Sequence, residues 1–465
     1  IVNRQLTSDQ NFAALRSLPR DWNIYNNTAL PTQNYQFTLG RVKELPKGKF
    51  GALFSLTYRN SQNIYNDVIR DYYDFDYTDD VYRFSTNIGG LANFAYTYGK
   101  SKITFKNIYN RSYDDQTLLR EGSNLATSND IKFFAFDLMQ KSLLKSTVEG
   151  THQLGEKSAK INWSLSYSNT LNDQPDQRKV NYARNPADVG TDNYVYSANI
   201  TTLGRENTRL FSKLSEDGYS AAVNYSLPIK MFKQSATFKT GLSSNYRDRD
   251  FSARFLGTVL NSTSADAAAI RTRPLNTLFA TDALPSYILD EIPNNLDSYT
   301  ANSIINAGYL MLDNKIGEKS RVVWGARVEQ FNVNLDGIVP TPETSVKQDY
   351  IDVLPSVNYT YSLNTKTNLR ASYYRTLARP EFRELSLGTF FDYEMIANLQ
   401  GNPNLKRALI DNADLRLEFY PSAGQILSIS GFYKKFTNAI ESFNSDATST
   451  RTITYFNSKN VIVYG

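Results

Sequence analysis

The sequence predicts an all-β chain whose strands form a transmembrane antiparallel β-barrel, and three observations lead to this class. Apolar or aromatic residues alternate with small polar ones in many short runs, which is typical of strands with one apolar face. Short turns and long polar segments separate these runs in alternation, as in barrels with turns at one membrane surface and loops at the other. The chain also has 32 Tyr and 26 Phe but only 4 Met, and aromatic rings favour pleated surfaces and membrane interfaces.

The clearest single unit is the stretch from Val353 to Tyr374, VLPSVNYTYSLNTKTNLRASYY. Odd-numbered positions from 353 to 363 are apolar, aromatic or proline, and the even-numbered ones are mostly small and polar. Asn364, Thr365 and Lys366 then reverse the chain, and the alternation resumes. Each arm has about the 9–11 residues that a tilted strand needs to cross a bilayer, so the stretch is predicted to be one membrane hairpin.

The same unit recurs along the chain and predicts about 15 strands. Residues 1–33 are predicted to be an extracellular loop with one short helical turn, and residues 34–465 to be barrel strands with their connections. The short turns, most of them basic, are expected on the periplasmic side at 46–49, 99–102, 155–158, 228–233, 317–320, 364–366 and 421–424. The long polar loops are expected on the extracellular side at 64–80, 112–129, 169–216, 253–298, 337–347, 381–408 and 441–450.

An odd number of strands does not close an ordinary single-chain bacterial barrel. The strand predicted at 34–45 descends toward a short turn, so an ascending strand is expected before it. The sequence is therefore predicted to be an interior slice of a larger barrel.

Composition argues against several other classes of protein. The chain has no Cys and one histidine, His152, so catalytic triads and thiolate or His-rich metal sites are not expected. The sequence predicts no enzyme, no cofactor and no bound metal. The formal net charge of +5 is scattered, which does not indicate nucleic-acid binding. No apolar run reaches about 18 residues, so no membrane-spanning helix is expected.

The stretch NIYNDVIRDYYDFDYTDD at residues 63–80 is rich in Tyr and Asp. Such a surface would suit a sugar, a peptide or a cationic ligand, and paired carboxylates would suit Ca²⁺. The plainer alternative is a solvated loop, since the spacing matches no EF-hand. The predicted ligand-binding residues are Asp71, Tyr72, Tyr73, Asp74, Asp76 and Tyr77.

The loop at 253–298 is long and fairly apolar, and loops of this length are usually functional. Three interpretations stay open: a lid over the barrel mouth, a docking surface for a partner, or a self-packed extracellular cap.

The chain from Tyr374 onward carries a more specific pattern. It reads YRTLARPEFREL at 374–385, FFDYE at 390–394 and GNPNLKRALIDNADLRLEFYPSAGQILSISGFYKKFTNAIE at 401–441. This text resembles the barrel of TonB-dependent outer-membrane receptors, and residues 284–317 and the opening LPRDWNIYNNTALPTQNYQFTLG are similar to the same family. The resemblance implies a barrel of about 22 strands filled by an N-terminal plug domain, in the outer membrane of a Gram-negative bacterium. The plug and the last strands would lie outside this sequence.

In a plugged barrel, charged residues on the polar faces of the strands point at the plug. Because an unpaired charge there is costly, each is expected to have a partner, and pairing to the plug is preferred over ligand contact. The plug-facing charges predicted in this way are Arg327, Glu329, Asp414, Arg416 and Glu418.

The resemblance implies an importer that binds a scarce or large nutrient at its extracellular face and releases it inward with energy delivered through TonB. The expected partners are the TonB complex, through the absent plug, and outer-membrane lipid; no nucleic acid is expected. One alternative is a barrel subunit of an outer-membrane assembly, secretion or adhesion complex, with a surface lipoprotein or other outer-membrane subunits as partners. Another is a passive porin.

Overall fold

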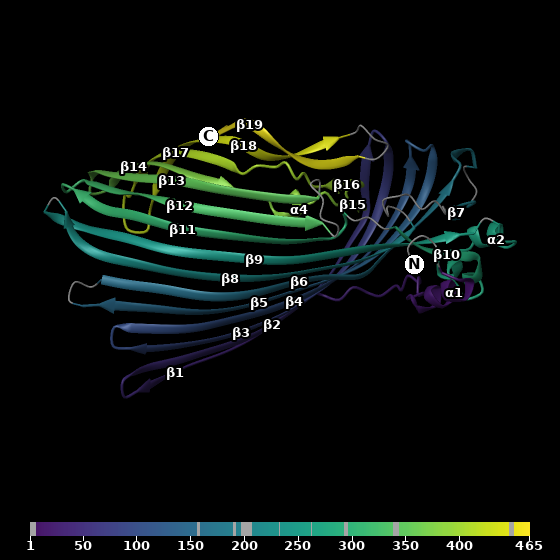
Figure 1. Ribbon diagram of the computed structural model, residues 1–465, viewed down its shortest axis with the longest axis horizontal. Helices are drawn as coiled ribbons and strands as arrows, with labels where there is room; N and C mark the ends of the chain where they lie inside the picture. The colour runs from purple at the N-terminus through teal and green to yellow at the C-terminus, as the bar shows by residue number, and fades with distance from the viewer. Residues whose placement is uncertain are drawn as a thin grey trace.

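The computed structural model describes residues 6–155, 159–188, 192–196, 207–231, 233–261, 263–292, 296–337, 344–445 and 451–465. Nineteen strands lie in this part of the chain, and fifteen of them form the wall of a wide trough (Figure 1). The wall strands are β1 Gln33–Leu45, β2 Gly48–Tyr72, β3 Phe75–Tyr98, β4 Ser101–Asn124, β5 Asn129–Leu154, β6 Ala159–Arg184, β8 Thr208–Met231, β9 Gln234–Leu260, β11 Tyr299–Ile316, β12 Ser320–Gly337, β13 Ser345–Asn364, β14 Thr367–Ala378, β17 Ala408–Phe419, β18 Leu427–Ser445 and β19 Thr452–Tyr464.

The remaining elements are shorter and pack against the parts of the wall strands away from the short turns. The short strands are β7 Val195–Tyr196, β10 Tyr287–Ile292, β15 Thr389–Asp392 and β16 Ala397–Gln400. The helices and 3₁₀ turns are α1 Ser8–Ser17, η1 Pro186–Asp188, α2 Ala267–Arg271, α3 Leu275–Leu278, η2 Leu284–Ser286 and α4 Phe382–Leu385. Among the described residues, no helix is long and apolar enough to cross a membrane.

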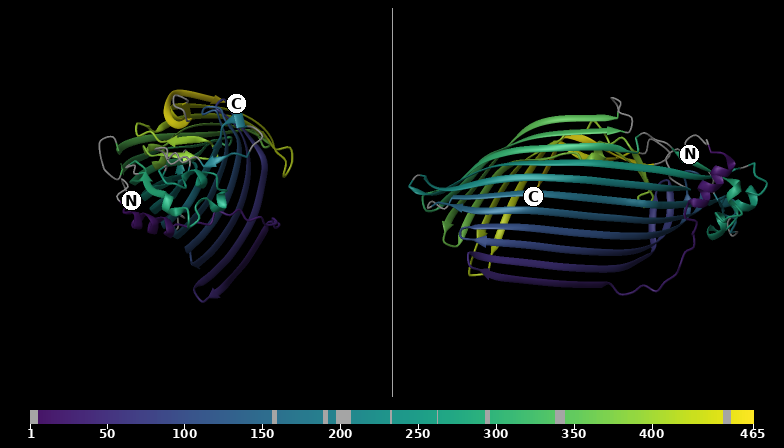
Figure 2. Two further views of the ribbon diagram at one scale, coloured as in Figure 1. Left: turned by 90° about the vertical axis from the view of Figure 1, so that its right-hand side faces the viewer. Right: turned by 60° about the horizontal axis from the view of Figure 1, so that its bottom comes forward.

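Each wall strand pairs antiparallel with the next wall strand along the chain, from β1 to β19. In Figures 1 and 2 the wall is strongly curved, and the tips of β2–β6 bend toward the strands near the C-terminus. Within the described residues, no backbone pairing joins β1 to β19. The prediction of an antiparallel barrel wall with about fifteen long strands is confirmed. In the described residues the second edge of β1 is unpaired, and the second edge of β19 pairs only with two residues of β16.

The strands are longer than the sequence pattern predicts. β2–β6, β8 and β9 have 24 to 27 residues each, whereas about 9–11 suffice to cross a bilayer. The long loops predicted at 64–80 and 112–129 are therefore wrong. A turn at residues 73–74 joins β2 to β3, and residues 125–128 join β4 to β5.

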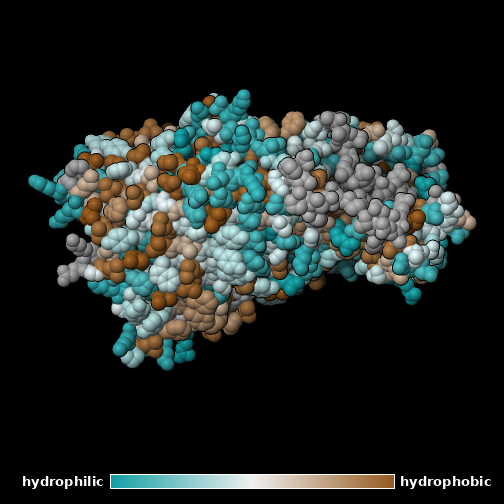
Figure 3. Space-filling model, viewed as in Figure 1, coloured by the Kyte–Doolittle hydropathy of each residue, from teal (hydrophilic) through white to brown (hydrophobic). Residues whose placement is uncertain are grey.

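The half of the wall next to the short turns has an apolar outer face and a more polar inner face. Leu165, Val223, Leu242 and Leu417 are exposed on the outer face, while Ala222, the neighbour of Val223 in β8, is half-buried on the inner face. Figure 3 shows hydrophobic residues recurring over this part of the molecule, which lies on the left of the view. Apolar side chains that face outward at alternate positions are the pattern of a barrel in lipid.

Residues 1–33 contain more structure than the single helical turn predicted. Helix α1 has ten residues and begins with a capping box. The Thr7 side chain accepts a hydrogen bond from the Gln10 backbone N–H, and the Gln10 side chain accepts one from the Thr7 N–H. Such reciprocal capping satisfies two of the free N–H groups at a helix start, so it favours the helix at this position.

Candidate functional site in the barrel mouth

The connection between β14 and β17 does not loop outward. These residues, 379–407, are called the mouth segment below, and they contain α4, β15 and β16. Among the described residues, four hydrophobic clusters are buried, and the mouth segment takes part in three of them. Phe382, Leu385 and Leu405 pack against β11–β13, Phe390 packs against β8 and β9, and Tyr393 packs against β3–β5. The segment thus crosses the interior of the trough (Figure 1).

Charged pairs hold the base of the mouth segment to the wall. Arg379 binds Glu329 of β12 at 2.6 Å, and Arg407 binds Asp352 of β13 at 2.6 Å. Both pairs are largely buried, so removing Glu329 or Asp352 would leave a buried arginine without its counter-charge, which is costly.

Gly401 lets the mouth segment return to the wall at close range. A Cβ atom there would lie 2.1 Å from the Ser386 carbonyl oxygen and 2.7 Å from that of Arg383. No side chain fits at such distances, so the fold of the segment requires glycine at this position.

The tip of the mouth segment, at the turn between β15 and β16, docks on polar residues of the inner wall. The Tyr393 hydroxyl donates to Asp137 at 3.2 Å and accepts from the Gln116 amide at 2.9 Å. The same amide donates to Glu394 at 2.9 Å, and Arg83 donates to Glu394 at 2.6 Å. Burial raises the pKa of Tyr393 well above its ordinary value, so the hydroxyl keeps its proton and remains a donor.

Below the tip lies a buried ion pair between neighbouring strands. Arg120 of β4 donates two hydrogen bonds to Asp79 of β3, at 2.6 and 2.7 Å, and a third to the Tyr393 backbone carbonyl at 2.8 Å. Its guanidinium also lies over the rings of Tyr77 and Phe133, 5.3 and 5.7 Å from their centroids. Bidentate geometry and aromatic contact are the features that suit arginine, rather than lysine, to such a site.

The strand periodicity divides the predicted Tyr/Asp ligand surface between two faces. Tyr77 is buried on the inner face beside Arg120, while Asp71 and Asp76 are exposed opposite each other on the outer face. Tyr72 lies under Arg451 and accepts a hydrogen bond from Asn444. Tyr73 and Asp74 form the turn. The six residues do not share one surface, and ligand binding by them stays a prediction.

No group of three or more His, Asp or Glu side chains in the described residues is arranged to hold a metal ion. The Ca²⁺ alternative for residues 63–80 therefore has no cluster to support it in that part of the chain.

The five charges predicted to face a plug lie on the inner face and are paired there. Arg327 and Arg379 both donate to Glu329 at 2.6 Å. Glu418 accepts from Arg370 at 2.8 Å and lies 3.2 Å from Arg416. Asp414 accepts a hydrogen bond from Ser372. These partners belong to the wall and the mouth segment, so contact with a plug stays a prediction.

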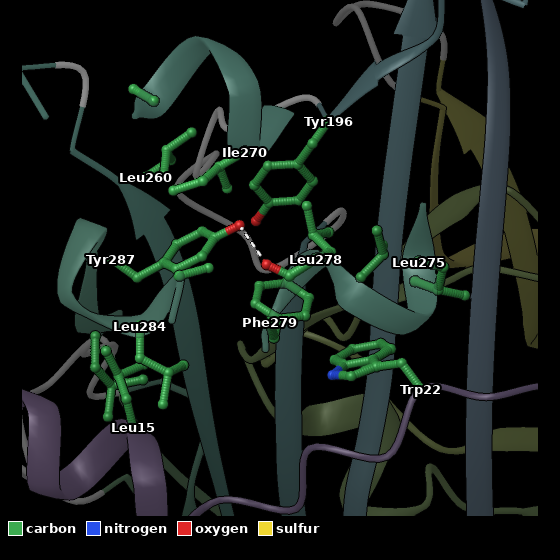
Figure 4. Packing of buried hydrophobic residues seen from close by; sticks show 14 of the residues in the cluster. Leu15, Trp22, Tyr196, Leu260, Ile270, Leu275, Leu278, Phe279, Leu284 and Tyr287 are labelled. Carbon is green, nitrogen blue, oxygen red and sulfur yellow. Dashed lines mark hydrogen bonds between the residues drawn. The ribbon is translucent and has the colours of Figure 1, made fainter. Parts of the chain in front are cut away.

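The segment at 253–298 extends strand β9 and then packs as a cap on the outer face of the wall. Its helices and η2 bury Ile270, Leu278 and Leu284 together with Leu15 of α1 and Trp22. Figure 4 shows these side chains converging, with the Tyr287 hydroxyl donating to the Leu278 carbonyl. The partly buried rings of Phe134 and Phe136 pack against the same cluster, while Phe133 and Ala135 of the same strand face the interior. Of the three interpretations, the self-packed cap agrees with this arrangement.

Two side chains attach the N-terminal segment to this cap. Asn11 of α1 donates to the Tyr287 carbonyl and accepts from the Leu289 N–H, both at 2.8 Å, and so replaces a strand partner for β10. The Trp22 ring packs against Phe279 of the cap, with ring centroids 5.0 Å apart, and it also contacts the wall through the guanidinium groups of Arg178 and Arg209, 5.1 and 5.5 Å from its ring centroid.

The tip and its wall partners were missed by the sequence analysis, which predicted a long extracellular loop at 381–408. The available signal was the aromatic and charged string FFDYE at 390–394. Rings in a solvated loop are unusual, because exposing them to water is unfavourable, so the string indicates a loop that packs.

Comparison with known proteins places this architecture. The model of the outer membrane protein beta-barrel family matches residues 152–465. Among solved structures, FpvA from P. aeruginosa bound to heterologous pyoverdines is 10% identical, over 93% of this chain and 50% of that chain, with a TM-score of 0.54. The Serratia marcescens hemophore receptor HasR, in complex with its hemophore HasA and heme, is 9% identical over 92% and 59%, with a TM-score of 0.52. The ferric-catecholate import receptor Fiu from E. coli K12 is 10% identical over 93% and 61%, with a TM-score of 0.51.

At these identities the likeness shows a shared fold. The chain spans less than two thirds of the length of the solved structures it matches. No curated protein matches the sequence.

Proposed function

The chain belongs to the outer membrane protein beta-barrel family, and from this premise we propose that it is part of an importer for a scarce or large nutrient, driven by energy delivered through TonB. It lies in the outer membrane of a Gram-negative bacterium, with the fold of TonB-dependent receptor barrels. The nutrient is taken up at the extracellular mouth and released to the periplasm.

The observation that carries the proposal is the mouth segment. A passive porin needs a water-filled path, whereas here aromatic anchors and ion pairs pack a segment across the interior. Fold neighbours that are described as an import receptor and a hemophore receptor support active uptake over passive diffusion.

The open edges support a second part of the proposal, that these residues are an interior slice of the barrel. Backbone groups of β1 and β19 that face lipid without a partner would each cost several kcal/mol. Importers of this fold have about 22 strands and a plugged lumen. We infer that further strands and an N-terminal plug, which carries the TonB contact, complete the protein, and that residues 1–33 lie outside the cell.

The test is growth of a deletion strain on limiting iron supplied as ferric siderophores or heme, and on limiting peptide and carbon sources. We expect a defect on one source that the full-length gene restores and that a TonB deletion reproduces. Equal growth on every source would contradict import. If another outer-membrane protein were then lost from the membrane, the assembly-subunit alternative would be supported.

A further inference from the structure

The inner wall of β3–β6 carries a cluster of five polar side chains, three of which bind the mouth segment. The cluster, called the wall site below, consists of Arg83, Gln116, Asp137, Gln174 and Gln177. Gln174 and Gln177 donate to the two oxygens of Asp137, at 2.7 and 2.9 Å, and so fix its carboxylate. The wall itself therefore positions the acceptor that the tip residue Tyr393 uses.

The wall site receives two chemical groups from the tip: a phenolic hydroxyl and a carboxylate. Gln116 donates one hydrogen bond to each of them, both at 2.9 Å, so the two groups lie within reach of a single amide. Arg83 neutralises the carboxylate of Glu394, and Asp137 accepts from the hydroxyl of Tyr393.

We propose that the wall site is a binding site for a small molecule that carries a phenolic hydroxyl close to a carboxylate, and that Tyr393 and Glu394 occupy it as an internal substitute until such a molecule displaces them. The inference rests on the proposed import function, because it assigns the wall site to cargo. The carboxylate of the cargo would bind Arg83 and Gln116, and its hydroxyl would donate to Asp137.

The ion pair of Glu394 at the tip is more exposed than the ion pair at the base of the mouth segment, although Tyr393 beside it is buried. The ion pair at the tip keeps 41% of the Arg83 side chain and 33% of the Glu394 side chain exposed, whereas Arg379 and Glu329 at the base keep 15% and 12%. An exposed pair is weakened by water and salt. Competition with a ligand requires a tip that can leave the wall site and return to it while the base of the mouth segment stays in place.

The contacts around the tip also leave polar atoms unsatisfied. In the part of the chain that the structure describes, Asn398 Oδ1 of β16 and Arg451 Nε are buried without a hydrogen-bond partner, and the Arg451 side chain donates to the Met395 carbonyl at the tip. Of the described residues of β15 and β16, only Asn398 and Leu399 pair with β19, in parallel. Buried polar atoms without partners disfavour the docked state, so they lower the free energy needed to release the tip.

The experiment measures the position of the tip in the full-length protein in detergent. Spin labels are placed on cysteines at Met395, which is exposed at the tip, and Glu121, which is exposed on the outer face of β4. Salicylate, a phenol with an adjacent carboxylate, is the probe, and benzoate, which lacks the hydroxyl, is the matched control. We expect salicylate to produce a second, longer distance and benzoate to produce much less of it.

A variant without the internal substitute sharpens the test. Tyr393→Phe with Glu394→Gln should raise salicylate affinity about tenfold by calorimetry, because a ligand no longer competes with two tip groups. Adding Arg83→Gln should abolish that gain. Glu149→Gln removes the partner of Lys106 in the half of the wall next to the short turns. This control variant should leave the affinity for salicylate unchanged.

Two results would overturn the proposal. One is a single unchanged label distance at every salicylate concentration that leaves the barrel folded. The other is equal salicylate affinity of the native and the Tyr393→Phe, Glu394→Gln proteins. Either would show the tip to be a permanent brace. Neither measurement depends on growth. The proposed import function, which is tested by growth of the deletion strain, can therefore fail or hold independently of the wall site.

Discussion

In the half of the wall next to the short turns, apolar side chains such as Leu165 and Val223 point outward and the interior is lined by smaller polar ones. In the mouth half, the same strands bury side chains on both faces: Phe133 and Leu118 inside, Phe134 and Val180 outside. We expect lipid to cover the outer face of the first half and water to surround the second. A sheet in water needs protein on each apolar face, and the mouth segment and the outer cap supply it.

The largest expected effect tests whether an ion pair contributes more to stability in the mouth half than in the half next to the short turns. Arg120→Met should destabilise the full-length barrel by about 3 kcal/mol in urea unfolding, the lower end for a broken buried pair, because the fully buried Asp79 loses its bidentate partner and, among the described residues, keeps only Arg70, 3.4 Å away. Lys106→Met removes the more exposed Lys106–Glu149 pair in the half next to the short turns and should lower the free energy of unfolding by less than about 1 kcal/mol. Equal costs would remove the distinction between the halves. The double variant Asp79→Leu, Arg120→Met should recover most of the loss.

An effect of similar size tests the lipid face. Val223→Arg should destabilise the barrel by about 2–4 kcal/mol, since the new charge points into hydrocarbon, while Ala222→Arg should be milder because it points inward. Folding yield and urea midpoint in lipid vesicles give the measurement. Similar values for the two variants would mean that the faces have been assigned wrongly.

The outer cap offers a milder test of the mouth half. Asn11→Ala removes both hydrogen bonds to the edge of β10 and should cost about 1–3 kcal/mol, because a buried backbone donor and acceptor lose their partner. The loss should be local. Hydrogen exchange should speed up at Leu289 and in α1 but not in β11–β14, and uniform acceleration would argue against a separately stabilised cap.

The last prediction concerns orientation and changes no stability. A cysteine at Tyr73, in the exposed turn between β2 and β3, should react with an impermeant thiol reagent on intact cells. A cysteine at Lys47, in the turn between β1 and β2, should react only after the outer membrane is opened. The chain has no native cysteine, so its background labelling is low. The reverse labelling pattern would mean that the short turns face outside and the mouth half faces the periplasm.

The sequence predicted the membrane half better than the mouth half, and the reason is physical. Alternation at Val353–Leu363 reports a strand because lipid on one face demands apolar residues at every second position. Above the membrane that demand ends, so the polar residues of 63–80 resemble a loop although they continue β2 and β3. The pattern also puts charges such as Glu329 on the polar face of their strands, but it does not show which residues pair with them. Periodicity describes one strand and does not show where a loop such as the mouth segment folds back.

The contact between Tyr72 and Asn444 joins residues 372 positions apart in the chain. Closing so long a loop costs more chain entropy than forming a hairpin between adjacent strands, and non-local contacts of this kind form slowly. The hairpins of the wall are therefore expected to form first, each from neighbouring sequence. The contact between the β2–β3 tip and β18 would form late. During biogenesis this side of the mouth would therefore stay open until nearly all the strands have assembled.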